Sequence, residues 1–197
     1  MKQRHKKRSR KKSGIGKALF FLILIGIIVT LFFLFRQEIF DSIKPWFEKR
    51  GILREKKEVV LYFSDQEGEY LVGEKRKILR RKDVEEAAEE TIVELIKGPR
   101  GKLIRTLPPQ TKLLTLKIDE KGVARVNFDK TLSKDHPGGS SAEIMSIYSI
   151  VNSLTLNFLQ IKRVQILIEG KTGESIAGHL ILDQPISSKT DLIKTLK

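Results

Sequence analysis

The longest apolar run in the chain covers residues 18–35, where ALFFLILIGIIVTLFFLF contains no charged side chain. As an α-helix this stretch would be about 27 Å long at ~1.5 Å per residue, close to the ~30 Å hydrocarbon core of a bilayer. A helix this apolar inside a soluble domain would need protein on all sides, yet it begins close to the N-terminus. The pattern therefore predicts a membrane-spanning helix over residues 18–35.

Residues 36–57 mix charged and apolar side chains and are broken by Pro45 and Gly51. Proline and glycine interrupt regular structure, so this segment is predicted to be a juxtamembrane stalk. Trp46 and Phe47 fit the headgroup zone of a bilayer, where amphipathic rings gather, and they fit a few apolar contacts of a linker equally well.

The chain then alternates between two periodicities over residues 58–186, about 130 residues, which is enough for one compact domain. Period-two patterns rich in β-branched and aromatic residues predict strands, and turn residues between consecutive runs predict hairpins. The predicted strands are residues 59–63, 69–79, 114–118, 124–128, 164–170 and 178–186. Residues 187–197 are polar and are expected to form a C-terminal tail.

Two helical patterns separate the strands. The first begins at Asp83, which forms a capping-box pattern with Glu86, and ends at Gly98-Pro99. Glycine can take the left-handed conformation after a helix, and proline cannot continue one. Acidic residues in the first half of this helix suit the positive end of its dipole and are expected to form a solvated face. They are Glu85, Glu86, Glu89 and Glu90.

The second helical pattern begins at Ser140, which forms another capping pattern with Glu143. Its wide apolar stripe includes Ile144, Ile147, Tyr148, Val151, Leu154, Thr155 and Phe158. So wide a stripe predicts the central core helix of the domain, with a protein-binding face as the alternative. The order of strands and helices predicts an α+β fold, in which two helices pack on a mainly antiparallel sheet.

Charge is distributed unevenly along the chain. Residues 1–17 contain nine Lys or Arg and no Asp or Glu. Basic residues beside a spanning helix hold that side in the cytoplasm, so we expect a cytoplasmic arm and an extracytoplasmic domain. The arm has no aromatic residue to stack on bases, which argues against a nucleic-acid partner. The apolar run is longer than that of a signal peptide and is not followed by a small-residue cleavage site, which favours a retained anchor.

The chain contains no cysteine. This excludes a lipid-modified cysteine, disulfides, thiolate metal sites and cysteine nucleophiles, so the domain must be held together by its own core. Asp135, His136 and Ser140 superficially suggest a catalytic triad. We instead expect a loop followed by a capping serine, because the aspartate and the histidine are adjacent in a turn-prone sequence. We therefore predict no enzymatic activity, no cofactor and no metal site.

One loop is a candidate contact site. His136, Gly138, Gly139 and Ser140 lead into the second predicted helix, whose exposed N–H groups and dipole could attract an anion. The loop lacks the lysine and the spacing of a P-loop, so a wall glycan or a carboxylate of a partner is the expected ligand. His179, at the start of a predicted strand, is expected to be a hydrogen-bonded structural residue.

Several short motifs follow one another through residues 58–186. They are Tyr62, Tyr70-Leu71-Val72, Leu95-Ile96-Lys97-Gly98-Pro99, Leu107-Pro108, Thr111-Lys112-Leu113-Leu114, Gly138-Gly139-Ser140, Glu143, Ile150-Val151-Asn152-Ser153-Leu154-Thr155, Gly178-His179 and Pro185-Ile186. In this order and spacing they resemble the GerM domain of bacterial sporulation and germination proteins. The resemblance implies a small extracytoplasmic module related to the ring-building domains of spore-envelope assemblies, with structural roles for Gly98, Pro99, Gly178 and His179.

Together with the anchor, the resemblance implies a membrane-anchored interaction or scaffold module of the bacterial cell envelope that acts by protein contact without catalysis. Its expected partners are the membrane, other envelope proteins and further copies of itself. The alternatives are a module that binds peptidoglycan and a regulator of a wall hydrolase. Anchoring would confine the domain to two dimensions and raise its effective concentration, so that modest contacts can assemble.

Overall fold

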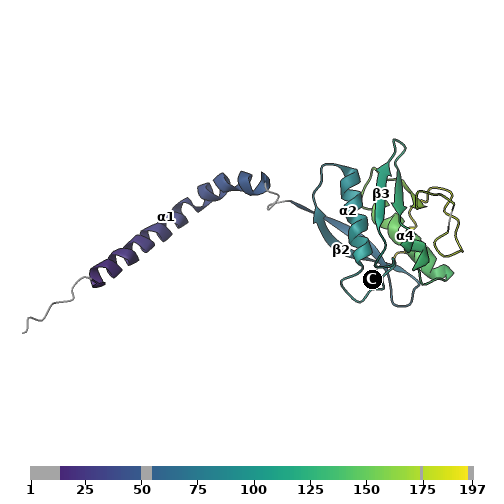
Figure 1. Ribbon diagram of the computed structural model, residues 1–197, viewed down its shortest axis with the longest axis horizontal. Coiled ribbons are helices and arrows are strands. Elements are labelled where there is room, and N and C mark those ends of the chain that lie inside the picture. Colours follow the sequence, from purple (N-terminus) through teal and green to yellow (C-terminus); the bar gives the residue numbers. More distant parts are fainter. Residues whose placement is uncertain (1–13, 50–54, 174, 195–197) are drawn as a thin grey trace, which may run out of the picture. The chain divides into compact units, whose positions relative to one another are not determined.

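The structure, a computed structural model, describes residues 14–49, 55–173 and 175–194. The chain consists of two units, which divide between Arg54 and Glu55. The first unit contains α1 (Gly14–Lys49). The second contains β1 (Lys56–Ser64), β2 (Leu71–Leu79), α2 (Val84–Lys97), β3 (Leu113–Ile118), β4 (Val123–Phe128), α3 (Thr131–Lys134), α4 (Ser140–Thr155), β5 (Arg163–Ile168) and the short 3-10 helix η1 (Thr190–Leu192) (Figure 1). These elements confirm the predicted α+β fold that follows an N-terminal apolar helix.

α1 contains the apolar run. Between Phe20 and Phe35 its large apolar side chains are all exposed, and the stretch Phe20–Glu38 is long and apolar enough to cross a membrane. The hydroxyl of Thr30, the one polar side chain within the run, donates to the carbonyl of Gly26 at 2.8 Å. The helix thus satisfies its own polar groups and presents an apolar surface all round, as a lipid environment would require.

The stalk expected over residues 36–57 has different boundaries in the structure. α1 continues through Pro45 to Lys49, and β1 already begins at Lys56. A proline removes a single intrahelical hydrogen bond, which a long helix can tolerate without ending. The expected break at Gly51 lies outside the described residues.

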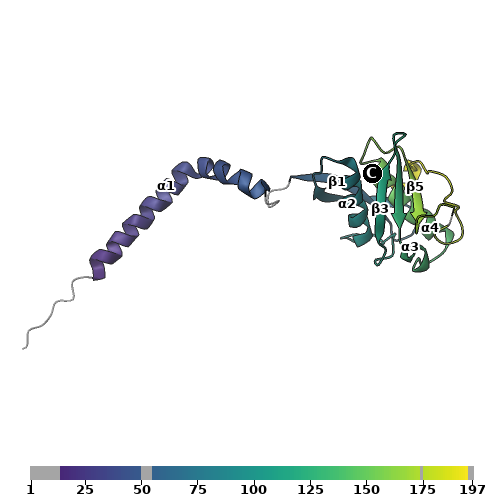
Figure 2. The same ribbon diagram turned by 45° about the horizontal axis from the view of Figure 1, so that its top comes forward.

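Within the described residues, five strands form two small sheets. β1 and β2 pair antiparallel, as predicted for the first hairpin, with Tyr62 opposite Gly73. β3 and β4 form the second predicted antiparallel hairpin, and β5 joins β4 in parallel (Figure 2). The parallel pair is possible because α4 forms the crossover between β4 and β5. The pairing is thus mainly antiparallel, but the strands are divided over two sheets instead of one.

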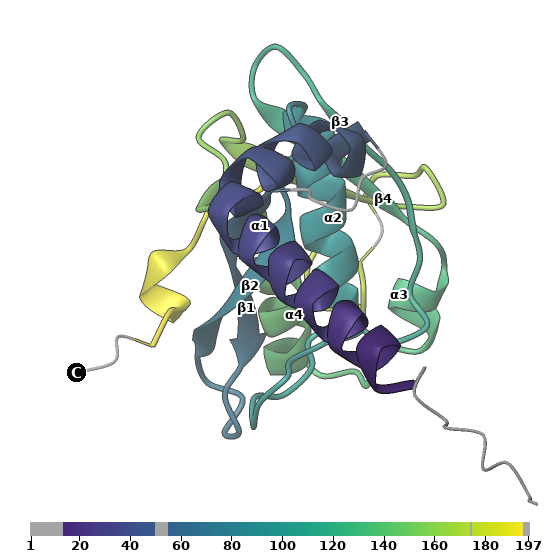
Figure 3. The same cartoon turned by 90° about the vertical axis from the view of Figure 1, so that its left-hand side faces the viewer.

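The two long helices of the second unit pack against both sheets. α2 lies between β2 and β3, and α4 packs against β1 and β5 (Figure 1, Figure 3). α4 is the predicted central core helix, since Ile147, Ile150 and Val151 are almost completely buried. The residues of the core cluster all lie between Val59 and Leu182, so this unit has a hydrophobic core of its own.

The acidic side of α2 is more than the solvated face expected from the sequence. The carboxylate of Glu85 accepts the backbone N–H of Ile118 in β3 at 2.8 Å, and that of Glu90 accepts the N–H of Leu79 in β2 at 2.9 Å. Glu86 is exposed, as expected. The two hydrogen bonds satisfy donors on both sheets and hold α2 between them.

The prediction of a last strand over residues 178–186 is wrong, because the described chain has no strand after β5. This segment makes a single bridge, at which Ile186 exchanges two backbone hydrogen bonds with Val164 in β5. Four residues before Ile186, the carbonyl of Leu182 accepts the side-chain amide of Gln165 at 2.6 Å. Side chains of the domain thus bind backbone groups of the segment that a strand would have paired, so its apolar residues do not produce a strand.

The polar tail expected over residues 187–197 is also different in the described part, which ends at Lys194. The side chain of Asn152 on α4 accepts the N–H of Lys189 at 2.9 Å and donates to its carbonyl at 3.0 Å. The N–H of Lys194 donates to the carbonyl of Leu71 in β2 at 2.8 Å. Polar composition did not reveal these contacts because backbone groups make most of them.

Candidate functional site

A row of polar side chains on and just after α4 covers the outer edge of β1. Asn157 accepts the N–H of Val60 at 2.8 Å and donates to the carbonyl of the same residue at 2.7 Å. Ser153 accepts the N–H of Tyr62 at 3.1 Å, and Ser149 donates to the carbonyl of Tyr62. These side chains take the place of a neighbouring strand and satisfy backbone groups that a sheet edge would leave open.

Sequence reasoning missed this polar row because the apolar stripe dominates α4. Ser146, Ser149, Ser153 and Asn157 recur at intervals of three and four residues, which is helical spacing. That spacing was the available signal for a second, polar face. All three serines are buried, so their hydroxyls need partners inside the protein.

The polar row reaches the predicted contact loop at its N-terminal end. Ser146 donates to the carbonyl of Thr106, and its oxygen lies 2.8 Å from Nε2 of His136. The N–H of Gly138 donates to Nδ1 of the same ring at 3.1 Å. Because Nδ1 accepts, the proton of the neutral imidazole lies on Nε2, which donates to Ser146.

This tautomer argues against catalysis by a serine–histidine pair. A general base must accept the proton of the serine, whereas here the ring donates to Ser146 and the serine proton is directed at a carbonyl. Burial lowers the pKa of His136, and the charge of Glu143 opposes this effect only in part, so the ring stays neutral near pH 7. The pair braces the contact loop against α4.

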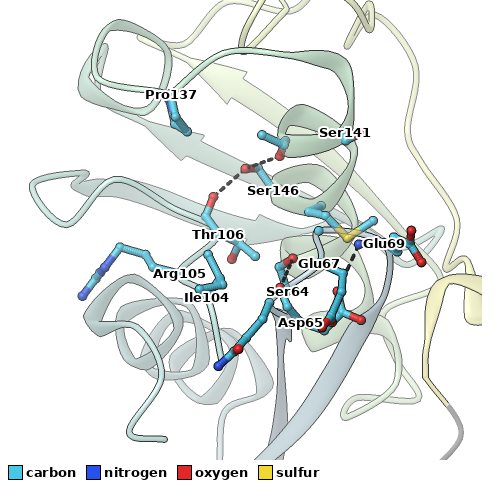
Figure 4. A pocket seen from close by; sticks show the side chains of 14 residues that line it. Ser64, Asp65, Glu67, Glu69, Ile104, Arg105, Thr106, Pro137, Ser141 and Ser146 are labelled. Carbon is cyan, nitrogen blue, oxygen red and sulfur yellow. Dashed lines mark hydrogen bonds between the residues drawn. The ribbon is translucent and has the colours of Figure 1, made fainter. Parts of the chain in front are cut away.

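An open pocket of about 500 Å³ lies beside this brace (Figure 4). Three segments line it: the turn between β1 and β2, residues 104–106, and the start of α4 together with Pro137. Ile104, Ala142 and Met145 supply its apolar surface. The pocket therefore offers a small apolar surface at the end of the domain where the contact loop lies.

The carboxylates of this pocket differ in burial and in the number of hydrogen bonds that they accept. Asp65 is buried, and its carboxylate accepts the N–H groups of Glu69 and Tyr70 and lies 3.1 Å from Nζ of Lys194. Burial alone would raise the pKa of Asp65, but these hydrogen bonds outweigh it and lower the pKa. Glu67 and Glu69 are exposed. Glu67 lies 3.9 Å from Nζ of the same Lys194, and Arg105 also lines the pocket, so cations partly balance the exposed carboxylates.

Glu143 forms a second polar centre, and its side chain is fully buried. Its carboxylate accepts the hydroxyl of Ser175 and the N–H groups of Ala177 and His179, each N–H at 2.9 Å, and lies 3.2 Å from Nδ1 of His179. Burial alone would raise the pKa of Glu143, but these donors outweigh it and lower the pKa. One carboxylate thus fixes the segment after β5 to α4, and His179 is the hydrogen-bonded residue that the sequence predicted.

The predicted capping pattern of α4 is wrong. Gly139 is the N-cap residue, Ser140 is the first helical residue, and no side chain caps the helix. Glu143 turns inward instead, because the donors of a distant segment bind it. Gly138 and Gly139 have positive φ angles of 85° and 83°, and a side chain at either position would meet no atom within 4 Å. The loop is therefore open to solvent here, and its role as a contact site stays a prediction.

Arg76 in β2 connects the first sheet to the end of α2. Only 2% of its side chain is exposed, and its guanidinium lies 2.6 Å from Glu74 and 3.2 Å from Glu94. It also donates to the carbonyl of Gly98 at 2.8 Å. Gly98 follows α2 with a φ of 83°, so the helix ends at the predicted glycine, and an added side chain there would collide with Arg105.

The fold and the site together define a small α+β domain that is braced by buried polar side chains and follows an apolar N-terminal helix. In the part of the chain that the structure describes, no group of three or more His, Asp or Glu residues could hold a metal ion. The chain matches the model of the Germane family, described as sporulation and spore germination, over residues 60–174. This match covers more than half of the chain, which therefore belongs to the Germane family. No curated protein matches it.

Solved structures share this fold. A protein of Clostridium perfringens described as a lipoprotein is 24% identical, with a TM-score of 0.50 over 71% of this chain and 93% of that chain. The first GerMN domain of the sporulation protein GerM from Bacillus subtilis is 20% identical, with a TM-score of 0.53 over 66% of this chain and 97% of that domain. The tandem GerMN domains of the same protein are 22% identical, with a TM-score of 0.49 over 72% and 48%. The resemblance to the GerM domain is thus confirmed.

Proposed function

We propose that this protein is a membrane-anchored interaction module of the bacterial cell envelope and acts in sporulation or germination. α1 is the retained anchor, and the α+β domain lies outside the membrane. The domain acts through contact with other envelope proteins and performs no catalysis. The observation that carries the proposal is the junction of an apolar helix, exposed on all sides, with a unit that has its own core.

Three further observations support it. The basic residues at positions 1–17 favour a cytoplasmic N-terminus, which would leave the domain on the opposite side. The Germane family description supplies the setting of sporulation and germination. The neutral His136 donates its proton to Ser146, so the most suggestive pair of side chains beside the pocket serves the fold.

The absence of cysteine in the sequence makes topology simple to test. Single variants Ser9→Cys and Ser188→Cys place one thiol in the basic arm and one on an exposed residue of the domain. A membrane-impermeant maleimide should label Ser188→Cys in intact cells and Ser9→Cys only after permeabilisation. Labelling in the reverse order would contradict the proposed orientation.

Cleavage and ligand choice are tested separately. The mass of the mature protein should equal that of the full chain, and a mass lacking the first 35 or more residues would identify a cleaved signal sequence. The cysteine-free domain should not co-sediment with purified peptidoglycan. Saturable binding there would favour the glycan-binding alternative over protein contact.

A further inference from the structure

The first sheet consists of β1 and β2, and its two edges differ in how many of their backbone groups have hydrogen-bond partners. The edge of β1 is covered from Val60 to Ser64, by Asn157 just after α4 at Val60, by serines of α4 at Tyr62 and by Ile104 at Ser64. Ile104 and Ser64 exchange two backbone hydrogen bonds, at 2.8 Å and 3.2 Å. No strand of the described chain pairs with the opposite edge, which belongs to β2.

The pairing register shows which groups of β2 face that edge. The backbone groups of Val60 and Tyr62 point away from β2, since they bond to side chains on and just after α4. In an antiparallel pair, two opposite residues both point toward each other or both point away. Lys75 lies opposite Val60 and Gly73 lies opposite Tyr62, and Lys77 continues the alternation. The N–H and C=O groups of these three β2 residues therefore face outward.

Both ends of this edge are occupied, but its centre is open. The carbonyl of Leu71 accepts the N–H of Lys194, and the N–H of Leu79 donates to Glu90. Between them, the six outward groups of residues 73, 75 and 77 make no hydrogen bond within the described part of the chain. Gly73 is exposed, so solvent reaches its backbone directly.

We propose that this open edge, Gly73 to Lys77, docks an extended acidic segment of a partner protein. The segment adds to the sheet as a third strand and pairs with the six outward backbone groups. Its carboxylates stand two residues apart, opposite Lys75 and Lys77 on one face of the sheet. The inference rests on the proposed function as an interaction module and gives that module a surface and a partner chemistry.

Charge selects this occupant over a second copy of the chain. Lys75 and Lys77 are exposed, and two β2 edges paired with each other would bring lysines together. Lysines on an edge oppose pairing with like strands, whereas they attract a strand with carboxylates. Glu58 lies 2.9 Å from Lys75, but both side chains are more than half exposed, so a partner carboxylate can replace it at little cost.

The test uses the unit from Glu55 onward, which has its own core, and two synthetic peptides. The acidic probe is acetyl-Thr-Val-Glu-Val-Glu-Val-Thr-amide, and the matched probe has lysine in place of both glutamates. Excess acidic peptide should slow amide exchange at Gly73, Lys75 and Lys77 by about tenfold or more, as expected for N–H groups that gain a partner. The lysine peptide should leave these rates unchanged.

Two variants test the mechanism. Lys75→Pro removes an outward donor that β1 does not use, so it should abolish the protection while the hairpin is retained. The double variant Lys75→Glu and Lys77→Glu keeps all backbone groups and should reverse the preference in favour of the lysine peptide. The matched control, Lys130→Glu with Lys171→Glu, changes two exposed lysines outside the first sheet and should behave as the parent protein.

Several results would overturn the inference. Equal binding of both peptides, or protection elsewhere with none at the β2 edge, would refute it. Protection that rises with protein concentration alone would identify a second copy as the occupant. The proposed edge does not include residues 195–197, so a variant that ends at Lys194 should bind the acidic peptide at least as well as the longer unit. Binding that depends on residues 195–197 would also contradict the proposal. None of these outcomes affects the labelling test of membrane topology, so the two proposals can fail independently.

Discussion

Glu143 offers the sharpest test of how this domain is held together. The substitution Glu143→Gln preserves the size and shape of the side chain but replaces one carboxylate oxygen by an NH₂ group. In the structure both oxygens accept: one receives Ser175 and the N–H of Ala177, and the other receives the N–H and the ring of His179. The new NH₂ group must face a donor, whichever way the amide turns.

The expected magnitude follows from these contacts. A hydrogen bond to a charged group contributes about 1.5 to 3 kcal/mol, and a buried donor without a partner costs a similar amount. We therefore expect Glu143→Gln to lower the free energy of unfolding by about 2 to 3 kcal/mol, or roughly 6 to 10 °C in Tm for a unit of this size. Differential scanning calorimetry of Glu143→Gln beside the exposed control Glu120→Gln measures the difference.

The pH dependence supplies an independent check. Because the folded-state pKa of Glu143 lies below the unfolded value, its contribution is complete above the ordinary glutamate pKa and is lost as pH falls through the lowered pKa. The stability gap between the parent protein and Glu143→Gln should thus be largest near neutral pH and should close in acid. The reasoning is refuted if Glu143→Gln, like the control Glu120→Gln, melts within about 1 °C of the parent protein. It is also refuted if the stability difference between the parent protein and Glu143→Gln becomes larger below pH 4.

Three further changes test other parts of the structure. Arg76→Met removes a buried cation from Glu74 and Glu94, although Glu94 keeps Lys97 and Arg100, and should cost about 2 to 3 kcal/mol in urea unfolding through the lost charged hydrogen bonds. Arg80→Met at an exposed position should cost less than about 1 kcal/mol. Asn157→Ala leaves an N–H and a carbonyl of β1 without partners and should cost about 2 to 3 kcal/mol by the same assay. Ile25→Asp combined with Ile28→Asp adds about 3 kcal/mol per carboxylate to insertion and should shift the protein out of the carbonate-resistant membrane fraction.

Each of these results can contradict its premise. Equal unfolding midpoints for the two arginine variants would show that the buried ion cluster contributes nothing to stability. An asparagine variant with unchanged stability would mean that water replaces the lost side chain at the β1 edge. Full membrane retention of the double aspartate variant would show that the apolar run is not what attaches the chain.

The hairpins and the two ends of α2 were predictable because short-range chemistry determines them. Alternation and a turn-forming glycine at Gly122 predicted the β3–β4 pair, and Asp83 and Gly98 marked the two ends of α2. In each case the residues that decide the structure are close neighbours in the sequence. The wide apolar stripe of α4 likewise predicted a core helix without knowledge of its partners.

Two of the errors, the cap of α4 and the last predicted strand, share one cause, which is that side chains bind backbone groups distant in the sequence. Ser140 and Glu143 have a capping pattern, but donors more than thirty residues later draw Glu143 inward. Residues 178–186 have the apolar residues of a strand, but Gln165 and Glu143 bind their backbone groups instead. Spacing along the chain could indicate a polar face on α4, but it does not show which distant backbone groups such side chains bind, so the division into two sheets could not be predicted from it.

The candidate site was predictable only in part. The loop from His136 to Ser140 was identified from its glycines and its place before a helix, and the structure puts it beside a pocket. The hydrogen bond between His136 and Ser146 needed the three-dimensional arrangement, because ten residues separate them. Gly178-His179 and Glu143 were separate motifs in the sequence. In the structure they are in contact, because the buried carboxylate of Glu143 accepts the N–H of His179.

The polar row that covers β1 also limits stoichiometry. A flat sheet with two unpaired borders can recruit neighbours on both sides and grow without end, as fibres do. Here asparagine and serine side chains close one border, so the sheet of β1 and β2 has a valence of one for strand addition. A complex formed at the other border of this sheet therefore stops at a single ligand, and any larger array must use a different surface.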